Sequence, residues 1–541
     1  MWSVALGALW ALSFASSMRR PVVRSDEAWF LWVAVRANSG ASLYRGVYYV
    51  TTPLGMWLMQ GLVWLFGAHL WVERALAAAC LTVSVGLLWA IARHLGMKTR
   101  GRLLLCGVVV LYGAPVAHFA SVYSMLAVTL SLGALAMLLR SFAAIDRGRS
   151  GCGEILATGA LCGGAFATKP NVGLLAFVAV IATLVIDRRQ PAIAPGRRRR
   201  QTAWSATGFF VTVAGMLLVV VVNGTAGAIF GDIFLGKGTA YFAIEGRHVL
   251  PGISRSFNLF SGNGSPFGLN VARTVHLVPC VALVLLIATG WRLRRSRVPA
   301  LVAVVAFALV GFAAAAPDFG PQHLTEAAPL LLGLPIIGFA LTGGVPAFAS
   351  PRGKRALATT AAIALVLGIG GVNAWAQRPA VRGHDRVVAE PVAQLSGPAT
   401  TALARDQIRA DTTELRHDTH GTVFLAFLSA SYYYLAAHLH DPTAYDYPGR
   451  SDLGPRGESG IIDTLHHHVR WVCVALPRRS HRALSPTAPR RLDAYVRHSF
   501  QLVEHLNACD LYERQRAAVA AGFSTARSGG ARCGRRWAGA C

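Results

Sequence analysis

The chain has 541 residues, of which 54% are hydrophobic and only 14% are charged, and its mean hydropathy is +0.46. A soluble protein carries about a quarter charged residues, so this composition excludes an ordinary soluble class. The formal net charge of +27 would indicate a nucleic-acid partner in a soluble protein. Much of it lies in short loops between apolar segments, where positive residues set membrane topology, so we expect no nucleic-acid partner.

Apolar runs close to the length of a membrane-spanning helix recur over residues 1–376. They predict a mostly α-helical, polytopic membrane bundle of about 11 spans, near residues 2–17, 71–93, 102–120, 121–139, 154–168, 171–186, 203–223, 268–290, 298–316, 326–343 and 355–376. The first run has small residues near its end, as a signal peptide does. It lacks a positively charged start, which favours a first helix instead.

Five loops rich in Lys and Arg decide how the apolar run at 52–68 is placed. They lie at 98–102, 140–149, 188–200, 292–297 and 352–355, and the positive-inside rule assigns all five to the cytoplasm. The loop at 18–70 is then outside, and the run at 52–68 does not cross. We therefore predict an interfacial or re-entrant helix there, with Trp57 and Trp64 at headgroup depth. Arg19 and Arg20 depart locally from the rule.

The region 377–515 has a soluble composition, and the same alternation of loops places it outside the cytoplasm. Within it, "RWVCVAL" at 470–476 predicts a buried strand. We predict a transmembrane domain at 1–376, a small α/β extracytoplasmic domain at 377–515 and a disordered tail at 516–541. The last two regions contain Cys473, Cys509, Cys533 and Cys541. An extracytoplasmic disulfide could form among these, but the sequence does not fix a pairing.

Two adjacent carboxylates, Asp26 and Glu27, follow the first apolar run in "VVRSDEAWF". One interpretation is a helix start, with Ser25 as the cap and acids in the first turn. The other is chemical, because a partly desolvated carboxylate at a membrane surface is well suited to act as a general base. Both interpretations can hold at once.

Several other ionisable residues lie at the ends of predicted spans. Arg74 could snorkel or bind a lipid phosphate, and Lys169 in "FATKPNVGLL" has the same two interpretations. The outer loops otherwise hold few cations, which favours a phosphate contact for Lys169. His323 and Glu326 flank a later span, where ionisable groups are functional candidates, although loop polarity explains them equally well. Tyr44 belongs to an aromatic group that could form an interfacial belt.

Motifs for soluble nucleotide chemistry are missing from the sequence. "GDIFLGKGT" resembles a P-loop, but Gly238 stands where Ser or Thr should follow the Lys. Three consecutive His residues at 466–468 cannot all face one ion from a regular helix or strand. We therefore expect no cofactor and no metal site there, and the sequence leaves a divalent-metal requirement open.

The stretches "SDEAWFLWVAVRANSGASLYRG" and "TTPLGMWLMQGLVWLFGAHLWVERAL" resemble the first outer loop of GT-C glycosyltransferases. The nearest groups are the protein O-mannosyltransferases, the lipid A aminoarabinose transferases and the RgtA/B/C/D-like proteins. "FATKPNVGLL", "FGPQHLTEAAPLLL" and "SASYYYLAAHLHDPTAYDYPGR" resemble later parts of the family. The resemblance covers most of residues 1–480 and implies a membrane-bound fold whose first outer loop lies on the membrane.

The resemblance also implies an activity. Family members transfer a sugar, with inversion, from a polyprenyl-phosphate donor to a protein, lipid or cell-envelope glycan outside the cytoplasm. Asp26 matches the catalytic base, with Glu27 beside it, and Lys169 and Arg74 match donor-phosphate positions. The remaining substrate-binding candidates are Tyr44, Tyr123 and His323.

One departure from the family concerns the second acid that several members carry at the outer start of a span. Here that place holds Val122, Tyr123 and Ser124. Either Glu27, Tyr123 or another outer acid substitutes, or one base suffices, or the protein is inactive. The resemblance implies a hexosyl- or pentosyltransferase of the plasma or inner membrane. The alternatives are a lipid-linked sugar flippase and an inactive assembly protein.

Overall fold

The computed structural model describes residues 2–18, 26–49, 51–113, 122–186, 195–231, 233, 298–316, 321–341, 387–389, 399–427, 429–445, 456–475 and 490–515. Several predicted features lie outside these ranges, namely the spans at 268–290 and 355–376, the basic loops at 292–297 and 352–355, and the tail at 516–541. The described part is mostly helical with a small sheet, which confirms the predicted class at that level.

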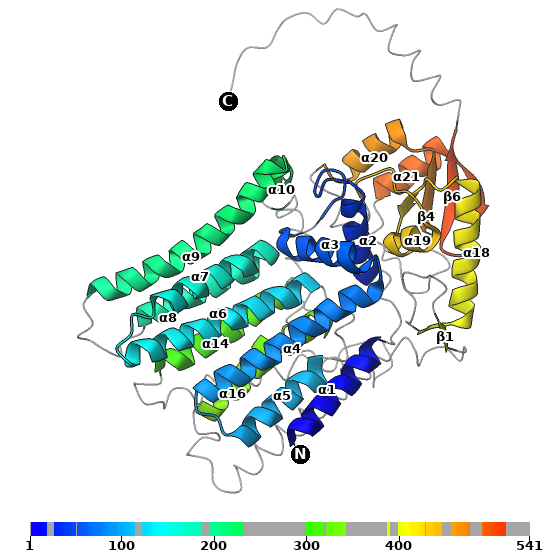
Figure 1. Ribbon diagram of the computed structural model, residues 1–541. Coiled ribbons are helices and arrows are strands. Elements are labelled where there is room, and N and C mark those ends of the chain that lie inside the picture. Colours follow the sequence, from blue (N-terminus) through cyan, green and yellow to red (C-terminus); the bar gives the residue numbers. More distant parts are fainter. Residues whose placement is uncertain are drawn as a thin grey trace, which may run out of the picture.

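Long helices lie side by side in a bundle (Figure 1). They are α1 (Trp2–Met18), α4 (Leu70–His94), α5 (Thr99–Gly113), α6 (Val122–Asp146), α7 (Cys152–Thr168), α8 (Pro170–Ile186), α9 (Pro195–Val222) and α14 (Val298–Ala315). Shorter helices are α10 (Ala226–Ile229), α15 (Pro321–Glu326), the π-helix η5 (Pro329–Gly333) and α16 (Leu334–Leu341). Three helices of the described part are long and apolar enough to cross a membrane, within α4, α6 and α9. The remaining spans of the predicted eleven stay predictions.

Small residues allow α7 and α9 to approach closely. Gly159 and Gly163 lie four residues apart on α7, as in the small-residue pattern of packed membrane helices. A Cβ atom added at Gly159 would lie 1.9 Å from the carbonyl oxygen of Ser205 on α9. One added at Gly208 of α9 would lie 2.1 Å from the carbonyl oxygen of Leu156. Larger side chains at these positions would therefore separate the two helices.

At one end of the bundle lie α2 (Asp26–Asn38) and α3 (Leu54–Phe66) (Figure 1). With 13 residues, α3 is about 20 Å long, which is too short to cross a hydrocarbon core of about 30 Å. Its Trp64 is 78% exposed, and Leu65 and Phe66 beside it are exposed as well, whereas Trp57 is half-buried. A short helix with an exposed apolar end agrees with the interfacial placement expected for 52–68.

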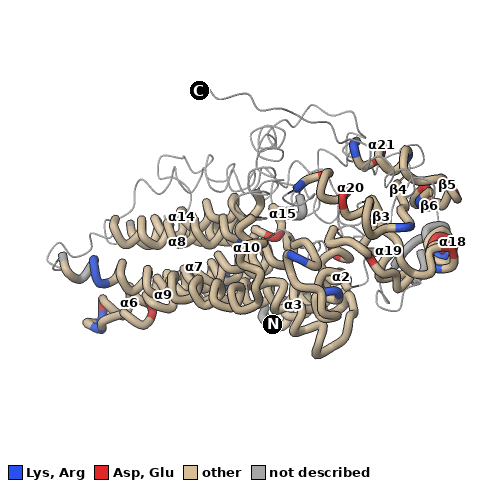
Figure 2. Tube along the Cα trace, turned by 90° about the horizontal axis from the view of Figure 1, so that it is seen from above, with Lys and Arg blue, Asp and Glu red and all other residues tan. Residues whose placement is uncertain are grey.

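Basic residues gather at the opposite end of the bundle from α2 and α3, while the helices between are almost free of charge (Figure 2). Lys98, Arg100 and Arg102 lie where α4 gives way to α5, and Arg147 and Arg149 follow α6. The first outer loop and these basic loops therefore lie at opposite ends of the helices. This arrangement agrees with the topology expected from the charge pattern.

The C-terminal region contains a four-stranded sheet in the order β3 (Phe424–Ala426), β4 (Trp471–Ala475), β6 (Cys509–Arg514) and β5 (Phe500–His505). β3 is parallel to β4, and the other neighbouring strands are antiparallel. The buried strand expected at 470–476 is confirmed as β4. The accompanying elements are α18 (Ala402–Asp418), α19 (Ala430–Ala437), α20 (Gly457–His468), α21 (Arg490–Ser499) and the pair β1 (Val387–Ala389) and β2 (Ala399–Thr401).

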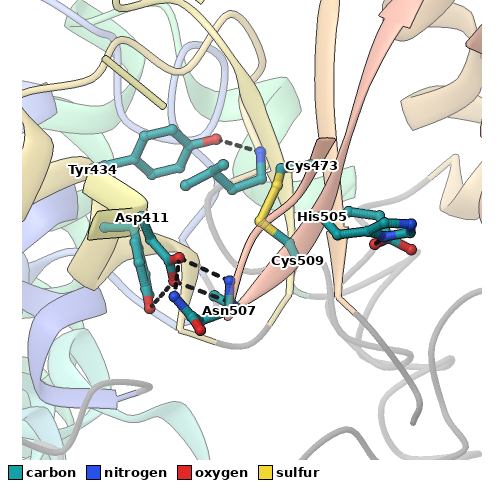
Figure 3. The surroundings of a disulfide bond; sticks show 10 residues. Asp411, Tyr434, Cys473, His505, Asn507 and Cys509 are labelled. Carbon is teal, nitrogen blue, oxygen red and sulfur yellow. Dashed lines mark hydrogen bonds and ion pairs between the residues drawn. A yellow bond between two sulfur atoms is a disulfide. The ribbon is translucent and has the colours of Figure 1, made fainter. Parts of the chain in front are cut away.

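A disulfide between Cys473 and Cys509 joins β4 to β6 and supplies the pairing that the sequence left open (Figure 3). Both cysteines are fully buried. Beside the bond, the Asp411 carboxylate accepts hydrogen bonds from the backbone and side-chain nitrogens of Asn507 at 2.8 and 2.9 Å. Disulfides persist in oxidising compartments, so this bond agrees with an extracytoplasmic location for the region.

Removing this disulfide should destabilise the C-terminal region. We expect Cys473→Ala to lower the free energy of unfolding by about 2–4 kcal/mol, because the open chain gains conformational entropy when unfolded. Limited proteolysis of the purified protein, with and without reductant, measures the effect, and Cys152→Ala is the control because Cys152 is a free cysteine. Equal protection of wild type and Cys473→Ala would contradict this expectation.

Candidate active site

The two acids at the start of α2 differ in burial. Asp26 is the first residue of the helix and is exposed, whereas Glu27 is 1% exposed. Successive helical positions differ by about 100°, so adjacent residues point in different directions. Both acids lie in the first turn, where the helix dipole favours negative charge. The helix start expected from the sequence is therefore present, and it gives the two carboxylates different environments.

Glu27 forms a buried ion pair with Arg74 in the first turns of α4. Arg74 Nε donates to Glu27 Oε1 at 2.6 Å, and Nη2 donates to Oε2 at 3.0 Å. The third nitrogen, Nη1, donates to the backbone carbonyl of Met18 at 2.9 Å. Two parallel hydrogen bonds of this kind fix the planar guanidinium and the carboxylate relative to each other. The pair therefore joins the start of α2 to α4 and to the end of α1.

A further acid, Glu73, lies beside this pair and was missed by the sequence reasoning. Its side chain is 2% exposed, and its charged neighbours are Glu27, Arg74 and Asp26. Within the described ranges, Glu73 Oε2 is buried and has no hydrogen-bond partner. The sequence feature that could have identified Glu73 is its position next to Arg74 at the start of a predicted span. An acid at this position also fits an ordinary helix start.

A cluster of aromatic residues packs against α2 near the acids. The Tyr49 ring is fully buried and lies 5.8 Å from the ring of Trp29 and 6.4 Å from that of Phe30, both on α2. Tyr44 lies 6.1 Å from Tyr49 and donates from its hydroxyl to the carbonyl of Thr51 at 2.6 Å. Tyr123, at the start of α6, lies 6.2 Å from Phe30. The predicted Tyr44 and Tyr123 are thus brought together around Tyr49.

The Tyr49 hydroxyl is buried and has no hydrogen-bond partner among the residues that the structure describes. Burial raises the pKa of Tyr49 well above its usual value, and nearby Tyr44, Tyr123 and Glu73 raise it further. The hydroxyl therefore stays protonated at physiological pH and is a hydrogen-bond donor in this part of the site.

Lys169 lies between α7 and α8, at the same end of the bundle as α2. Its ammonium donates to Ser124 Oγ at 3.1 Å and to the carbonyl of Ala314 at 2.6 Å, and it lies 5.8 Å from the centroid of the Tyr123 ring. Asn171 donates to the carbonyl of Ala313 at 2.8 Å, so both side chains cap the end of α14. Lys169 thus has a structural contact in addition to its place in the site.

His323 and Glu326 lie one helical turn apart on α15, with His323 Nδ1 3.3 Å from Glu326 Oε2. Glu326 is 3% exposed and interacts electrostatically with the ammonium group of Lys169. The structure therefore places His323 beside the Lys169 side of the site. The π-helix η5 begins three residues after the end of α15, and short π-helical segments are frequent at functional sites.

The C-terminal region contacts the helix that carries the acids. The rings of Trp32 on α2 and Tyr434 on α19 stack at 5.3 Å. Arg36 donates to the carbonyls of Thr443 at 2.7 Å and Gly46 at 2.9 Å. The backbone nitrogen of Tyr48 donates to Ala444 at 2.7 Å. These contacts join α2 and the loop after it to the C-terminal region.

One group of potential metal ligands lies in the described part, far along the chain from the site. Glu414, His417 and Asp418 on α18 place ligand atoms within 4.8 Å of one another. All three are on the outer surface of the helix or partly exposed, as charged helix faces commonly are. The three His residues at 466–468 end α20, where His467 lies 3.7 Å from Asp463.

Comparisons with known proteins match a family model and solved structures. A family model described as dolichyl-phosphate-mannose-protein mannosyltransferase matches residues 50–217, a range that includes Arg74, Tyr123 and Lys169. A search of curated proteins gives no match. The structure of ArnT from Cupriavidus metallidurans bound to undecaprenyl phosphate is similar at 15% identity and a TM-score of 0.53, covering 95% of this chain and 98% of that chain.

A second solved structure, the Archaeoglobus fulgidus oligosaccharyltransferase in the apo form, is similar at 11% identity and a TM-score of 0.51. That match covers 94% of this chain and 74% of the oligosaccharyltransferase. The chain has the GT-C glycosyltransferase fold. The resemblance predicted from the sequence is thereby confirmed at the level of the fold.

The three helices long and apolar enough to cross a membrane agree with the membrane localisation expected from the sequence. The resemblance led us to expect a second acid at the start of α6, and here this place contributes Tyr123 and Ser124 beside Lys169. Among the described residues, a buried acid near the Glu27–Arg74 pair is Glu73, which comes from α4.

Proposed function

We propose that the protein is a membrane glycosyltransferase that moves a sugar from a polyprenyl-phosphate donor to an acceptor at the extracytoplasmic face. The observation that carries the proposal is the difference between the two acids, of which Glu27 is buried and Asp26 is exposed. Arg74 binds Glu27 within the protein, while Asp26 on the same helical turn is exposed at the bundle end that also holds Lys169. A positioned base and a cation at one end of a GT-C fold are the groups that this transfer requires.

Asp26 is the proposed general base. It takes the proton of the acceptor hydroxyl as the acceptor oxygen forms a bond to the anomeric carbon of the donor sugar. The bond from that carbon to the phosphate oxygen breaks, and polyprenyl phosphate leaves with the electron pair. Attack on the face opposite the leaving group inverts the anomeric configuration. Phosphate leaves readily as an anion, so the reaction needs no strong general acid.

Lys169 is the proposed phosphate contact. Its described hydrogen-bond acceptors are a hydroxyl and a backbone carbonyl, which leave its charge able to interact with an anion. A preorganised cation stabilises the negative charge that grows on the departing phosphate. Tyr123 beneath the ammonium and His323 near Glu326 complete the proposed substrate surface on this side.

Arg74 receives a different role from the one expected from the sequence. All three of its nitrogens already contact Glu27 or Met18, so we assign the Glu27–Arg74 pair to holding α2 in place rather than to phosphate binding. Tyr44 packs against Tyr49 and belongs to the wall of the site.

Mass spectrometry of cell-envelope glycans and glycoproteins tests the proposal in cells. We expect deletion of the gene to remove one hexose or pentose mass from a specific glycan, lipid or protein, and re-expression to restore it. The same loss of envelope sugar, with the lipid-linked sugar accumulating on the cytoplasmic side instead of the outer side, would favour a flippase. An unchanged envelope and unchanged donor pools would favour an inactive assembly protein.

We expect Lys169→Met to weaken the binding of undecaprenyl phosphate by about tenfold or more, because one charge-assisted contact to phosphate is lost. Met keeps the aliphatic volume of the side chain. Lys98→Met, at the other end of the bundle, is the matched control and should bind as wild type does. Isothermal titration in nanodiscs measures both, and equal affinities for all three proteins would remove Lys169 from this role.

A further inference from the structure

Two buried polar groups from different segments interact electrostatically and have no hydrogen-bond partners in the described part of the chain. They are the Tyr49 hydroxyl, on a side chain with no exposure, and Glu73 Oε2, on a side chain 2% exposed. A buried polar atom without a partner costs free energy, so such atoms in native proteins call for an explanation. The two groups are complementary, because a phenol donates a hydrogen bond and a carboxylate accepts one.

The surroundings hold both groups in place at the first turns of α2. Trp29 and Phe30, one helical turn beyond Asp26, pack on the Tyr49 ring at 5.8 and 6.4 Å. Glu73 is adjacent in the chain to Arg74, whose guanidinium Glu27 binds. The carboxylate of Glu73 influences the Tyr49 hydroxyl electrostatically, and Asp26 in turn influences Glu73. Glu73 therefore interacts electrostatically with both the proposed base and Tyr49.

We propose that Tyr49 and Glu73 form the subsite that binds the transferred sugar of the donor, with the phenol donating to one sugar oxygen and the carboxylate accepting from a sugar hydroxyl. This inference rests on the proposed function and names the part of the substrate that the site recognises. A sugar ring carries neighbouring hydroxyls that can satisfy a donor and an acceptor together. Each unpartnered group would then gain its missing hydrogen bond when the donor is bound.

The location favours the donor sugar over the acceptor. Asp26 is exposed and can be reached from solvent, whereas Tyr49 and Glu73, the latter in the first turn of α4, are buried. A donor held by a lipid tail enters from the membrane, so its sugar arrives on the buried side. From Tyr49 the aromatic contacts lead through Phe30 to Tyr123, and from Tyr123 to Lys169, where the donor phosphate is proposed to lie.

The test compares sugar-bearing with bare lipid. Wild type, Tyr49→Phe and Glu73→Gln are placed in nanodiscs and titrated with undecaprenyl phosphate and with undecaprenyl phosphate carrying mannose, glucose, galactose or aminoarabinose. We expect wild type to bind one sugar-bearing lipid more tightly than the bare lipid. Each variant should reduce that advantage by about tenfold, the loss expected for one hydrogen bond in a buried site. Affinity for bare undecaprenyl phosphate should not change.

A second readout separates binding from a structural role. Tyr49→Phe removes a buried hydroxyl and Glu73→Gln removes a buried charge, neither of which has a described partner, so their melting temperatures should equal or exceed that of wild type. Tyr495→Phe and Glu414→Gln, in the C-terminal region, are matched controls that should keep the sugar advantage. The inference is wrong if the variants keep that advantage, if no sugar gives wild type an advantage, or if both affinities fall together with the melting temperature. Failure of wild type to bind bare undecaprenyl phosphate would count against the proposed function instead.

Discussion

Asp26→Asn is expected to lower the rate of sugar transfer by about 10²–10⁴-fold, the usual contribution of a positioned general base. The amide keeps the shape of the side chain but cannot accept the acceptor proton at neutral pH. Asp26 is exposed, so the fold should be unaffected. Transfer of radiolabelled sugar from a reconstituted undecaprenyl-phosphate donor to envelope acceptors measures the rate.

The matched control for this change is Asp406→Asn, an exposed acid on α18 that is paired with its neighbour Arg405. It should transfer sugar at the wild-type rate. If Asp26→Asn also turned over donor at a rate close to wild type, Asp26 would lose its role as the base, and Glu73 would become the next acid to test.

Arg74→Ala should be the most destabilising single substitution among those considered for the described part. It leaves the carboxylate of Glu27 buried without its charge partner, a change that costs about 3–5 kcal/mol in buried ion pairs. It also removes the contact to the end of α1 through Met18. Thermal unfolding in detergent measures the loss, and donor turnover should fall with it because α2 carries Asp26.

The double variant Glu27→Gln with Arg74→Met provides the control for that prediction. It removes both charges and keeps similar volumes, so it should regain much of the stability that Arg74→Ala loses. A single variant as stable as wild type, or a double variant less stable than the single one, would show that the ion pair does not hold α2 against α4.

Features of the fold could be predicted where the positions of basic loops and the lengths of apolar runs agree. The alternation of basic loops led to a non-crossing segment at 52–68, and the structure forms a helix of 13 residues within it. The strand at 470–476 was predictable because a continuous run of buried β-formers has few alternatives. The disulfide partners could not be predicted, because pairing depends on the register of β4 against β6 rather than on sequence spacing.

The site was predicted as a set of residues but not as an arrangement. The sequence singled out Glu27 and Arg74 separately, and their separation of 47 positions hid the ion pair. Burial decides their roles, because it turns Glu27 into a structural partner and leaves Asp26 exposed. Glu73 and Tyr49 could not be selected from the sequence, since an acid in a first turn and a tyrosine in an aromatic loop both have ordinary explanations. Their importance rests on unpartnered polar atoms, which only coordinates reveal.

The central claim, transfer of a sugar from a polyprenyl-phosphate donor, is tested most directly with the purified wild-type chain in liposomes. Undecaprenyl phosphate carrying a labelled sugar is supplied with an acceptor fraction from the envelope of a deletion strain. We predict that undecaprenyl phosphate is released in the same amount as sugar is attached, and that the anomeric configuration of the sugar is inverted. Donor that crosses the bilayer intact, with no undecaprenyl phosphate released and no sugar attached, would contradict the claim.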